Sequence, residues 1–110
     1  MGGAPVVDRE WIVAVEPKEV RLRCRYTRRG NQMLAYTVQL EIWQQQQWRR
    51  VVRYDNAHGF CHRDTIHPDG SQDKMPIYRG DINSNFTWAI KEIRANWQAH
   101  RARFLEEIEP

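Results

Sequence analysis

Residues 19–42 alternate between apolar and polar side chains along most of their length, and this period of two constrains the fold more than any other feature. A period of two predicts strands that bury one face and present the other to polar surroundings. Gly30 and Asn31 separate two such runs and both tolerate a positive φ, so the chain is expected to turn back here as a β-hairpin. The buried positions are expected to be Val20, Leu22, Cys24, Tyr26, Leu34, Tyr36, Val38, Leu40 and Ile42.

Three shorter segments extend the pattern of strands. Residues 48–54 and 60–66 predict a third and a fourth strand, and residues 10–16 predict an additional strand near the N-terminus. The connecting turns are expected in the glutamine tract 44–47, in the NAHG sequence at 56–59 and in the HPDGS sequence at 67–71. Together these segments predict an antiparallel meander of four to five strands.

The period changes in the last part of the chain, where apolar side chains recur every three or four residues. This spacing predicts an amphipathic helix of roughly 25 residues, with Asp81 or Asn83 as its N-cap. Strands followed by one terminal helix predict an α+β fold, in which the long C-terminal helix packs on one face of the meander. The apolar stripe, which is expected to be core, contains Phe86, Ile90, Ile93, Trp97, Phe104 and Ile108.

The length and composition predict a single folded domain over residues 1–110. A chain of 110 residues with 41% hydrophobic and 28% charged side chains can build one modest core. No apolar run approaches the ~20 residues of a transmembrane helix, and the first residues do not resemble a secretion leader, so a cytoplasmic protein is expected. In that compartment Cys24 and Cys61 are expected to be reduced thiols.

Arginine dominates the basic residues, with fourteen arginines and three lysines. Arginine makes bidentate contacts with phosphates and carboxylates, so a nucleic-acid-binding face is one hypothesis. The alternative is a solvated face, or one paired with acidic side chains of a neighbouring strand such as Glu41. The residues expected to bind nucleic acid are Arg21, Arg23, Arg25, Arg49 and Arg50.

The segment from residue 53 to 70 contains three of the four histidines, together with several aspartates and arginines. Strand alternation places His62 and Asp64 on one face, whereas Arg63 and His67 fall on the other. An imidazole oriented by a carboxylate, with an arginine beside it, suits general acid–base chemistry on an anionic substrate. The predicted catalytic set is His58, His62, Arg53, Asp55, Asp64 and Tyr54.

Two other interpretations of this segment stay open. A metal site formed by His58, His62 and Asp64 is conceivable, but it matches no established ligand spacing, so no metal and no cofactor is expected. In the other interpretation Asp55 and Asn56 cap a turn and the histidines are surface groups that bond to the backbone.

The RYDN sequence at residues 53–56, followed by histidines and a C-terminal helix, resembles the TumE-type toxins of toxin–antitoxin modules. In this chain His62, Arg63 and Asp64 stand where those toxins carry consecutive histidines. The resemblance implies a toxin encoded beside a helix-turn-helix antitoxin and acting on RNA. On this basis we expect a metal-independent RNase; the alternative is a non-catalytic module that binds nucleic acid or protein through its arginine-rich sheet face. A homodimer is also left open, and no membrane partner is expected.

Overall fold

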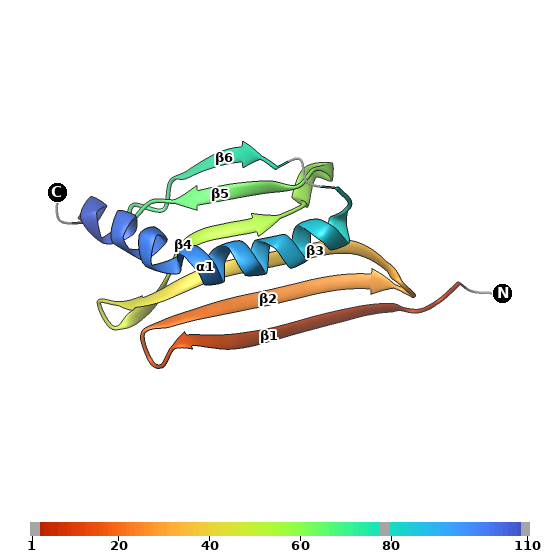
Figure 1. Ribbon diagram of the computed structural model, residues 1–110, viewed down its shortest axis with the longest axis horizontal. Helices are drawn as coiled ribbons and strands as arrows, with labels where there is room; N and C mark the ends of the chain where they lie inside the picture. Colours follow the sequence, from red (N-terminus) through yellow and green to blue (C-terminus); the bar gives the residue numbers. More distant parts are fainter. Residues whose placement is uncertain (1–2, 78–79, 109–110) are drawn as a thin grey trace.

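The computed structural model describes residues 3–77 and 80–108, which form one antiparallel sheet covered on one side by a long helix (Figure 1). This arrangement confirms the predicted α+β class. The sheet has six strands rather than the expected four to five. The elements are β1 (Val6–Glu16), β2 (Val20–Arg29), β3 (Gln32–Gln44), β4 (Gln47–Asp55), β5 (His62–Ile66), β6 (Gln72–Pro76) and α1 (Ile82–Ile108).

Each strand pairs with the next one along the chain, so the order in the sheet is the order in the sequence. The turns expected at residues 30–31, 44–47, 56–59 and 67–71 lie where the sequence predicts them. Gly30 adopts a φ of 57° between β2 and β3, and Gly70 one of 89° between β5 and β6. Gln45 and Gln46 adopt φ values of 56° and 63°, which is the backbone that a two-residue hairpin requires if it is to follow the twist of its strands.

Strand β6 is the strand that the sequence does not predict. Its five residues are all exposed, so no buried face imposes a period of two on them. The strand forms by pairing with β5, in a register that places Asp64 opposite Lys74. Backbone hydrogen bonds and not a hydrophobic pattern therefore define this edge of the sheet.

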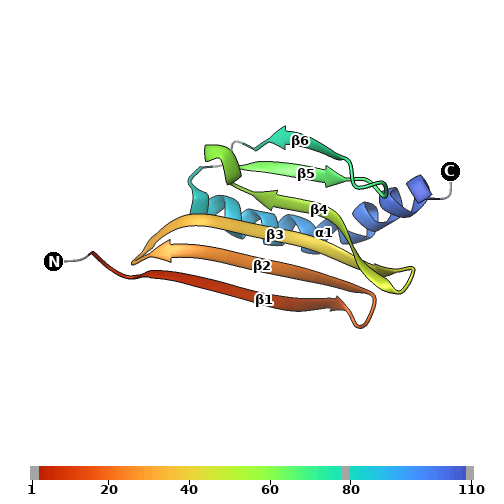
Figure 2. The ribbon, with the colours of Figure 1, turned by 180° about the vertical axis from the view of Figure 1, so that it is seen from behind.

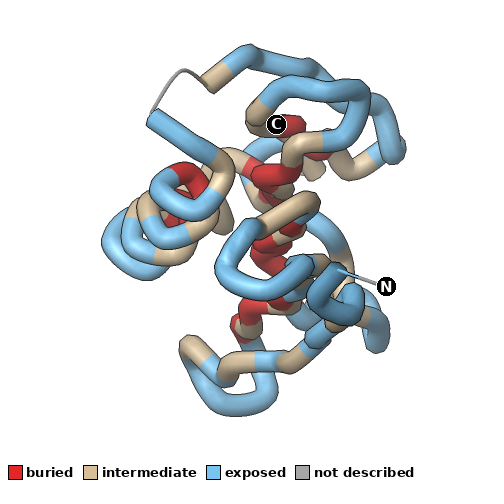
Figure 3. Tube along the Cα trace, turned by 90° about the vertical axis from the view of Figure 1, so that its right-hand side faces the viewer, coloured by how far each residue is buried: buried red, intermediate tan, exposed pale blue. Residues whose placement is uncertain are grey.

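The hydrophobic core lies between α1 and the central strands (Figure 3). The helix packs mainly on β3 and β4. At its start Phe86 makes edge-on contacts with the rings of Trp11, Tyr26 and Tyr36, which come from β1, β2 and β3. The completely buried core side chains include Leu22, Val38, Leu40, Val51, Val52, Tyr54, Ala89 and Ile93.

Both ends of the helix are fixed by polar contacts. Asp81, one of the two predicted candidates, is the N-cap, because its Oδ1 accepts a hydrogen bond of 2.8 Å from the backbone N–H of Ser84. Near the other end Arg103 donates to the carbonyls of Ile66 and Val51, each at 2.8 Å. Within the described ranges, no helix combines the length and the apolar character that crossing a membrane requires.

In the part of the chain that the structure describes, no helix covers the face of the sheet opposite α1, which is seen directly in Figure 2. We call it the open face. The strand register and the alternation with core residues place on it polar side chains of five strands, β2 to β6. These side chains include Arg21, Arg23, Arg25, Gln39, Glu41, Arg53, Asp55, His62, Asp64 and Lys74.

Candidate functional site

Five charged or titratable side chains meet on the open face of β4, β5 and β6. Cross-strand pairing places Arg53 opposite Asp64, Asp55 opposite His62, and Asp64 opposite Lys74. Directly opposed side chains of adjacent strands lie on the same face and within contact distance. We call this group, formed by Arg53, Asp55, His62, Asp64 and Lys74, the β4–β6 cluster.

Arg53 holds the two carboxylates of the cluster. Its Nε donates to Asp55 Oδ2 at 3.0 Å, and its Nη2 donates to Asp64 Oδ2 at 2.7 Å. Asp64 is 1% exposed, and burial by itself would raise the pKa of its carboxyl group. The hydrogen bond from Arg53 and the nearby charges of His62 and Lys74 outweigh burial, so the pKa of Asp64 lies below its ordinary value.

His62 has a partner for either protonation state of its Nε2. This nitrogen lies 2.8 Å from Asp55 Oδ1 and 3.0 Å from Lys74 Nζ, while Nδ1 lies 3.2 Å from the carbonyl oxygen of Phe60. A single nitrogen cannot donate to a carboxylate and accept from an ammonium at once. Nε2 can therefore donate to Asp55 when it carries a proton and accept from Lys74 when it does not.

Access to the cluster is controlled by the side chains around His62. The His62 ring is fully buried, and the ring of Phe60, whose residue is 40% exposed, lies 5.1 Å from it. Lys74 is the most exposed member of the cluster, with 43% of its side chain accessible. A ligand on the open face would therefore meet Lys74 and Phe60 first, and would reach Nε2 after the lysine moves aside.

Three members of the cluster have the atoms and the spacing of a metal site. One ligand atom from each of Asp55, His62 and Asp64 lies within 4.8 Å of the others. The sequence suggested His58, His62 and Asp64 as the conceivable ligand set. The structure replaces His58 by Asp55, because the strand pairing brings Asp55 directly opposite His62.

His58, which belongs to the predicted catalytic set, lies outside the cluster. It is exposed in a short 3₁₀ turn (Ala57–Gly59) and adopts a left-handed φ of 67°. Among the described residues, no hydrogen bond or ion pair joins it to the cluster. The turn interrupts the strand alternation between β4 and β5, which is why sequence spacing alone misplaces this residue.

Tyr54 also lies outside the cluster, on the helix side of the sheet. Its hydroxyl donates to Glu92 Oε2 at 2.8 Å, its ring packs edge-on against Trp88, and burial raises its pKa. Asn56 ties β4 to β3, since its amide donates to the Leu34 carbonyl and accepts from the Tyr36 N–H. Of the RYDN residues, Arg53 and Asp55 therefore belong to the cluster, and Tyr54 and Asn56 have structural contacts.

The five arginines predicted to bind nucleic acid do not form one free surface. Glu41 accepts from Arg21 at 2.7 Å and from Arg23 at 3.1 Å, as the alternative interpretation of the arginine face expected. Arg49 lies on the helix side, where it stacks over Phe104 and donates to the Pro68 carbonyl. Arg25 keeps 57% of its side chain exposed. Arg50 is exposed and pairs in register with Glu41.

Glu41 should contribute a pH-dependent part of the stability. Burial would raise its pKa, but hydrogen bonds from Arg21, Gln39 and Arg23 lower it below 4.5. A lowered pKa in the folded state means that the contribution is present above the unfolded pKa and is lost as the pH falls through the folded one. We expect Glu41→Gln to cost about 1–3 kcal/mol at pH 7 and clearly less near pH 3, measured by urea unfolding. A cost that stays constant across this pH range would contradict the assignment.

Sequence reasoning missed two sets of polar side chains, one in the β4–β6 cluster and one on the helix side of the sheet. Lys74 completes the β4–β6 cluster from the unpredicted strand β6. On the helix side, Glu92 contacts Tyr54 at 2.8 Å and His100 at 3.1 Å. The spacing of Glu92 and His100 by eight residues, on one face of a predicted helix, is the signal that could have identified the second group.

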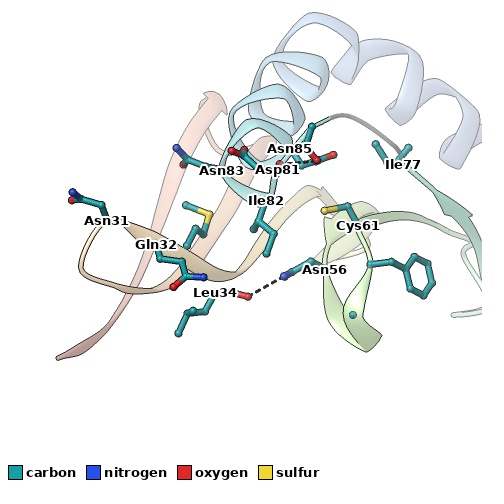
Figure 4. Close-up of a pocket in the computed structure, with 14 residues that line it drawn as sticks. Asn31, Gln32, Leu34, Asn56, Cys61, Ile77, Asp81, Ile82, Asn83 and Asn85 are labelled. Carbon is teal, nitrogen blue, oxygen red and sulfur yellow. Dashed lines mark hydrogen bonds between the residues drawn. The ribbon is translucent and has the colours of Figure 1, made fainter. Parts of the chain in front are cut away.

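A cavity of ≈ 1030 Å³ lies beside the start of α1 (Figure 4); none of the five cluster residues lines it, but Phe60, which packs against His62, does. It is bounded by the β2–β3 turn, the segment after β4 and the first turn of the helix. The titratable groups among its described lining residues are Asp81, which caps the helix, and Cys61, whose pKa is raised by burial. The cavity therefore offers amides and apolar groups to a ligand, and the acid–base groups lie in the β4–β6 cluster. Its amide side chains come from Asn31, Gln32, Asn56, Asn83 and Asn85.

A family model described as a domain of unknown function, DUF7718, matches residues 7–110. Neither the curated proteins nor the solved structures give a significant match.

Proposed function

We propose that this chain, which belongs to the DUF7718 family, is a small toxin-like RNase that cleaves RNA without a metal ion at the β4–β6 cluster. The observation that carries the proposal is the position of His62 Nε2, 2.8 Å from Asp55 and 3.0 Å from Lys74. A general base needs an orienting partner for its protonated form and a route by which the proton arrives and leaves. The resemblance of the RYDN segment to TumE-type toxins supports the same proposal.

RNA suits this site because it carries its own nucleophile. His62 Nε2 takes the proton of the ribose 2′-hydroxyl, and the 2′-oxygen forms a bond to phosphorus. The bond between phosphorus and the 5′-oxygen breaks, and that oxygen takes a proton from the Lys74 ammonium. The products are a 2′,3′-cyclic phosphate and a 5′-hydroxyl, and Arg53 stabilises the charge that develops on the phosphate in between.

The surroundings of the cluster fit a single-stranded RNA. Phe60 beside His62 and Trp43 near the other end of the open face are 40% and 48% exposed, and exposed aromatic rings stack on unpaired bases. Arg25 on the same face is 57% exposed and makes only a 3.7 Å ion pair with the exposed Asp8, which a phosphate would replace. Binding of this kind weakens as the salt concentration rises, by ~0.7 in log affinity per log salt for each phosphate that is neutralised.

An acidic helix-turn-helix antitoxin is the proposed protein partner. Its acidic surface would compete for the partly exposed arginines of the open face, Arg23 and Arg25, and would cover the route to His62. A neighbouring gene that encodes such a protein would favour this proposal. Coexpression of that gene should then relieve any growth arrest that the chain causes.

The function is tested with three oligonucleotides of one sequence, made as RNA, 2′-O-methyl RNA and DNA, each incubated with the protein in EDTA. We expect cleavage of the RNA alone, with cyclic-phosphate ends, because the other two strands lack the free 2′-hydroxyl. Cleavage of DNA, or cleavage that EDTA abolishes, would exclude this chemistry. Binding without cleavage of any strand would favour the non-catalytic module.

A further inference from the structure

The carboxylates and the imidazole of the β4–β6 cluster have the donor set of a transition-metal site. Asp55, His62 and Asp64 offer two carboxylate oxygens and one imidazole nitrogen within 4.8 Å of one another. One nitrogen and two oxygens suit Zn²⁺, Co²⁺, Mn²⁺ or Fe²⁺, whereas Ca²⁺ prefers a shell made of oxygens alone. Three protein ligands also leave at least one coordination position open.

The groups behind these ligands orient them as a metal site requires. His62 Nδ1 faces the Phe60 carbonyl at 3.2 Å, which can accept a hydrogen bond from Nδ1; in that tautomer the Nε2 lone pair faces the carboxylates. Asp55 Oδ1 accepts from the backbone N–H of Ala57 at 2.9 Å. Arg53 binds one oxygen of each carboxylate. All three ligands are therefore fixed by contacts outside the ligand set.

Asp64 supplies a second, independent observation. It is 99% buried, yet its Oδ1 has no hydrogen-bond partner within the described part of the chain. A buried carboxylate oxygen without a hydrogen bond is costly unless a cation compensates it. The nearest cation to this oxygen is Lys74 Nζ, which lies 3.4 Å away in ionic contact.

Lys74 thus takes the place that a metal ion would take. Its ammonium contacts both His62 Nε2 and Asp64 Oδ1, at 3.0 and 3.4 Å. It stands on the edge strand β6 with 43% of its side chain exposed, so it can leave without disturbing the core. A lysine that contacts His62 Nε2 and pairs ionically with Asp64 Oδ1 competes directly with any cation for these two atoms.

We propose that Asp55, His62 and Asp64 form a binding site for a divalent transition-metal ion of the zinc class, for which Lys74 is the built-in competitor. This inference does not depend on the RNase proposal, because metal binding is read out without RNA. If the chain does cleave RNA by acid–base chemistry, a bound ion occupies Nε2 and inhibits the reaction. The rate of RNA cleavage would then fall as the concentration of the free metal ion rises.

The test is a titration with Co²⁺ followed by its visible absorption, on the wild-type protein and the Lys74→Ala variant. We expect Lys74→Ala to bind Co²⁺ at least roughly tenfold more tightly, because it removes a positive charge that lies 3.0 Å from His62 Nε2 and 3.4 Å from Asp64 Oδ1. Lys91→Ala, which removes an exposed lysine of the helix, is the control and should not change the affinity. Equal affinities of wild type and Lys74→Ala, or no visible absorption with either, would overturn the proposal.

Ligand variants made in the Lys74→Ala background locate the ion. His62→Gln and Asp64→Asn should each weaken Co²⁺ binding by about a hundredfold, whereas Asp73→Asn, on the neighbouring position of β6, should not. If a ligand variant does not fold, paramagnetic broadening of NMR signals in Lys74→Ala replaces it. Broadening centred on Asp55, His62 and Asp64 supports the site, and broadening centred elsewhere overturns it.

Discussion

Replacing His62 with glutamine should lower the rate of RNA cleavage by about 10²–10⁴-fold, which is the usual contribution of a positioned general base. Glutamine fills most of the buried volume and keeps a polar group near Asp55, but it cannot accept and release a proton near neutral pH. Since His62 is fully buried, alanine would instead leave a cavity and confuse loss of chemistry with loss of stability. The rate is measured with labelled RNA in EDTA.

His67→Gln is the matched control for this prediction. His67 is the other histidine beside β5, but its ring lies on the helix side, where it contacts Glu107 at 2.9 Å and Asp73 at 2.7 Å. These two carboxylates raise the pKa of His67, so it titrates like a paired surface histidine. The His67→Gln variant should cleave RNA as the wild type does. Equal losses in both variants, or full activity of His62→Gln, would show that His62 is not the base.

Replacing Arg53 with methionine should lower the free energy of unfolding by about 3 kcal/mol. Arg53 bonds to both Asp55 and Asp64, and its loss leaves two carboxylates of low exposure with Lys74 and His62 as their remaining partners. Removing one partner of a buried ion pair costs far more than removing a surface charge, because the other charge stays buried without compensation. Urea unfolding of the two proteins at pH 7 measures the difference.

Arg50→Met serves as the control on the same strand. Arg50 is exposed, so its replacement should change the stability by about 0.5 kcal/mol or less. If both arginine variants lose little stability, the carboxylates of the β4–β6 cluster are not held by Arg53. If both variants lose several kcal/mol of unfolding free energy, replacing either arginine of β4 destabilises the protein, and the loss is not specific to the cluster.

The core-forming elements could be predicted from the sequence because their buried apolar side chains recur with the period of a strand or of a helix. Leu22, Leu40 and the other inward residues of β2 and β3 follow a strict period of two, and the helix follows its own period with Asp81 at the start. Strand β6 was not predictable in this way. Its residues are exposed, and the strand exists because β5 offers backbone partners.

The site could be predicted in part for the same reason. Alternation along β5 correctly separated His62 and Asp64 from Arg63 and His67. The pairing of Asp55 with His62 and of Lys74 with Asp64 depends instead on the register of β4, β5 and β6, which the turns between these strands set. His58 and Tyr54 were included in the predicted catalytic set because they are close to His62 in the sequence. In the structure His58 lies on the 3₁₀ turn and Tyr54 lies on the helix side of the sheet.

The claim that the open face of β4, β5 and β6 is the working surface of this protein is tested most directly by NMR. Backbone amide shifts are followed while 2′-O-methyl RNA, which cannot be cleaved, is added at low salt. The account predicts that the largest changes fall on Arg53, His62 and Lys74 and fade as salt is added. Changes confined to the exposed side of α1, around Lys91 and Arg94, or no changes at any RNA concentration, would contradict it.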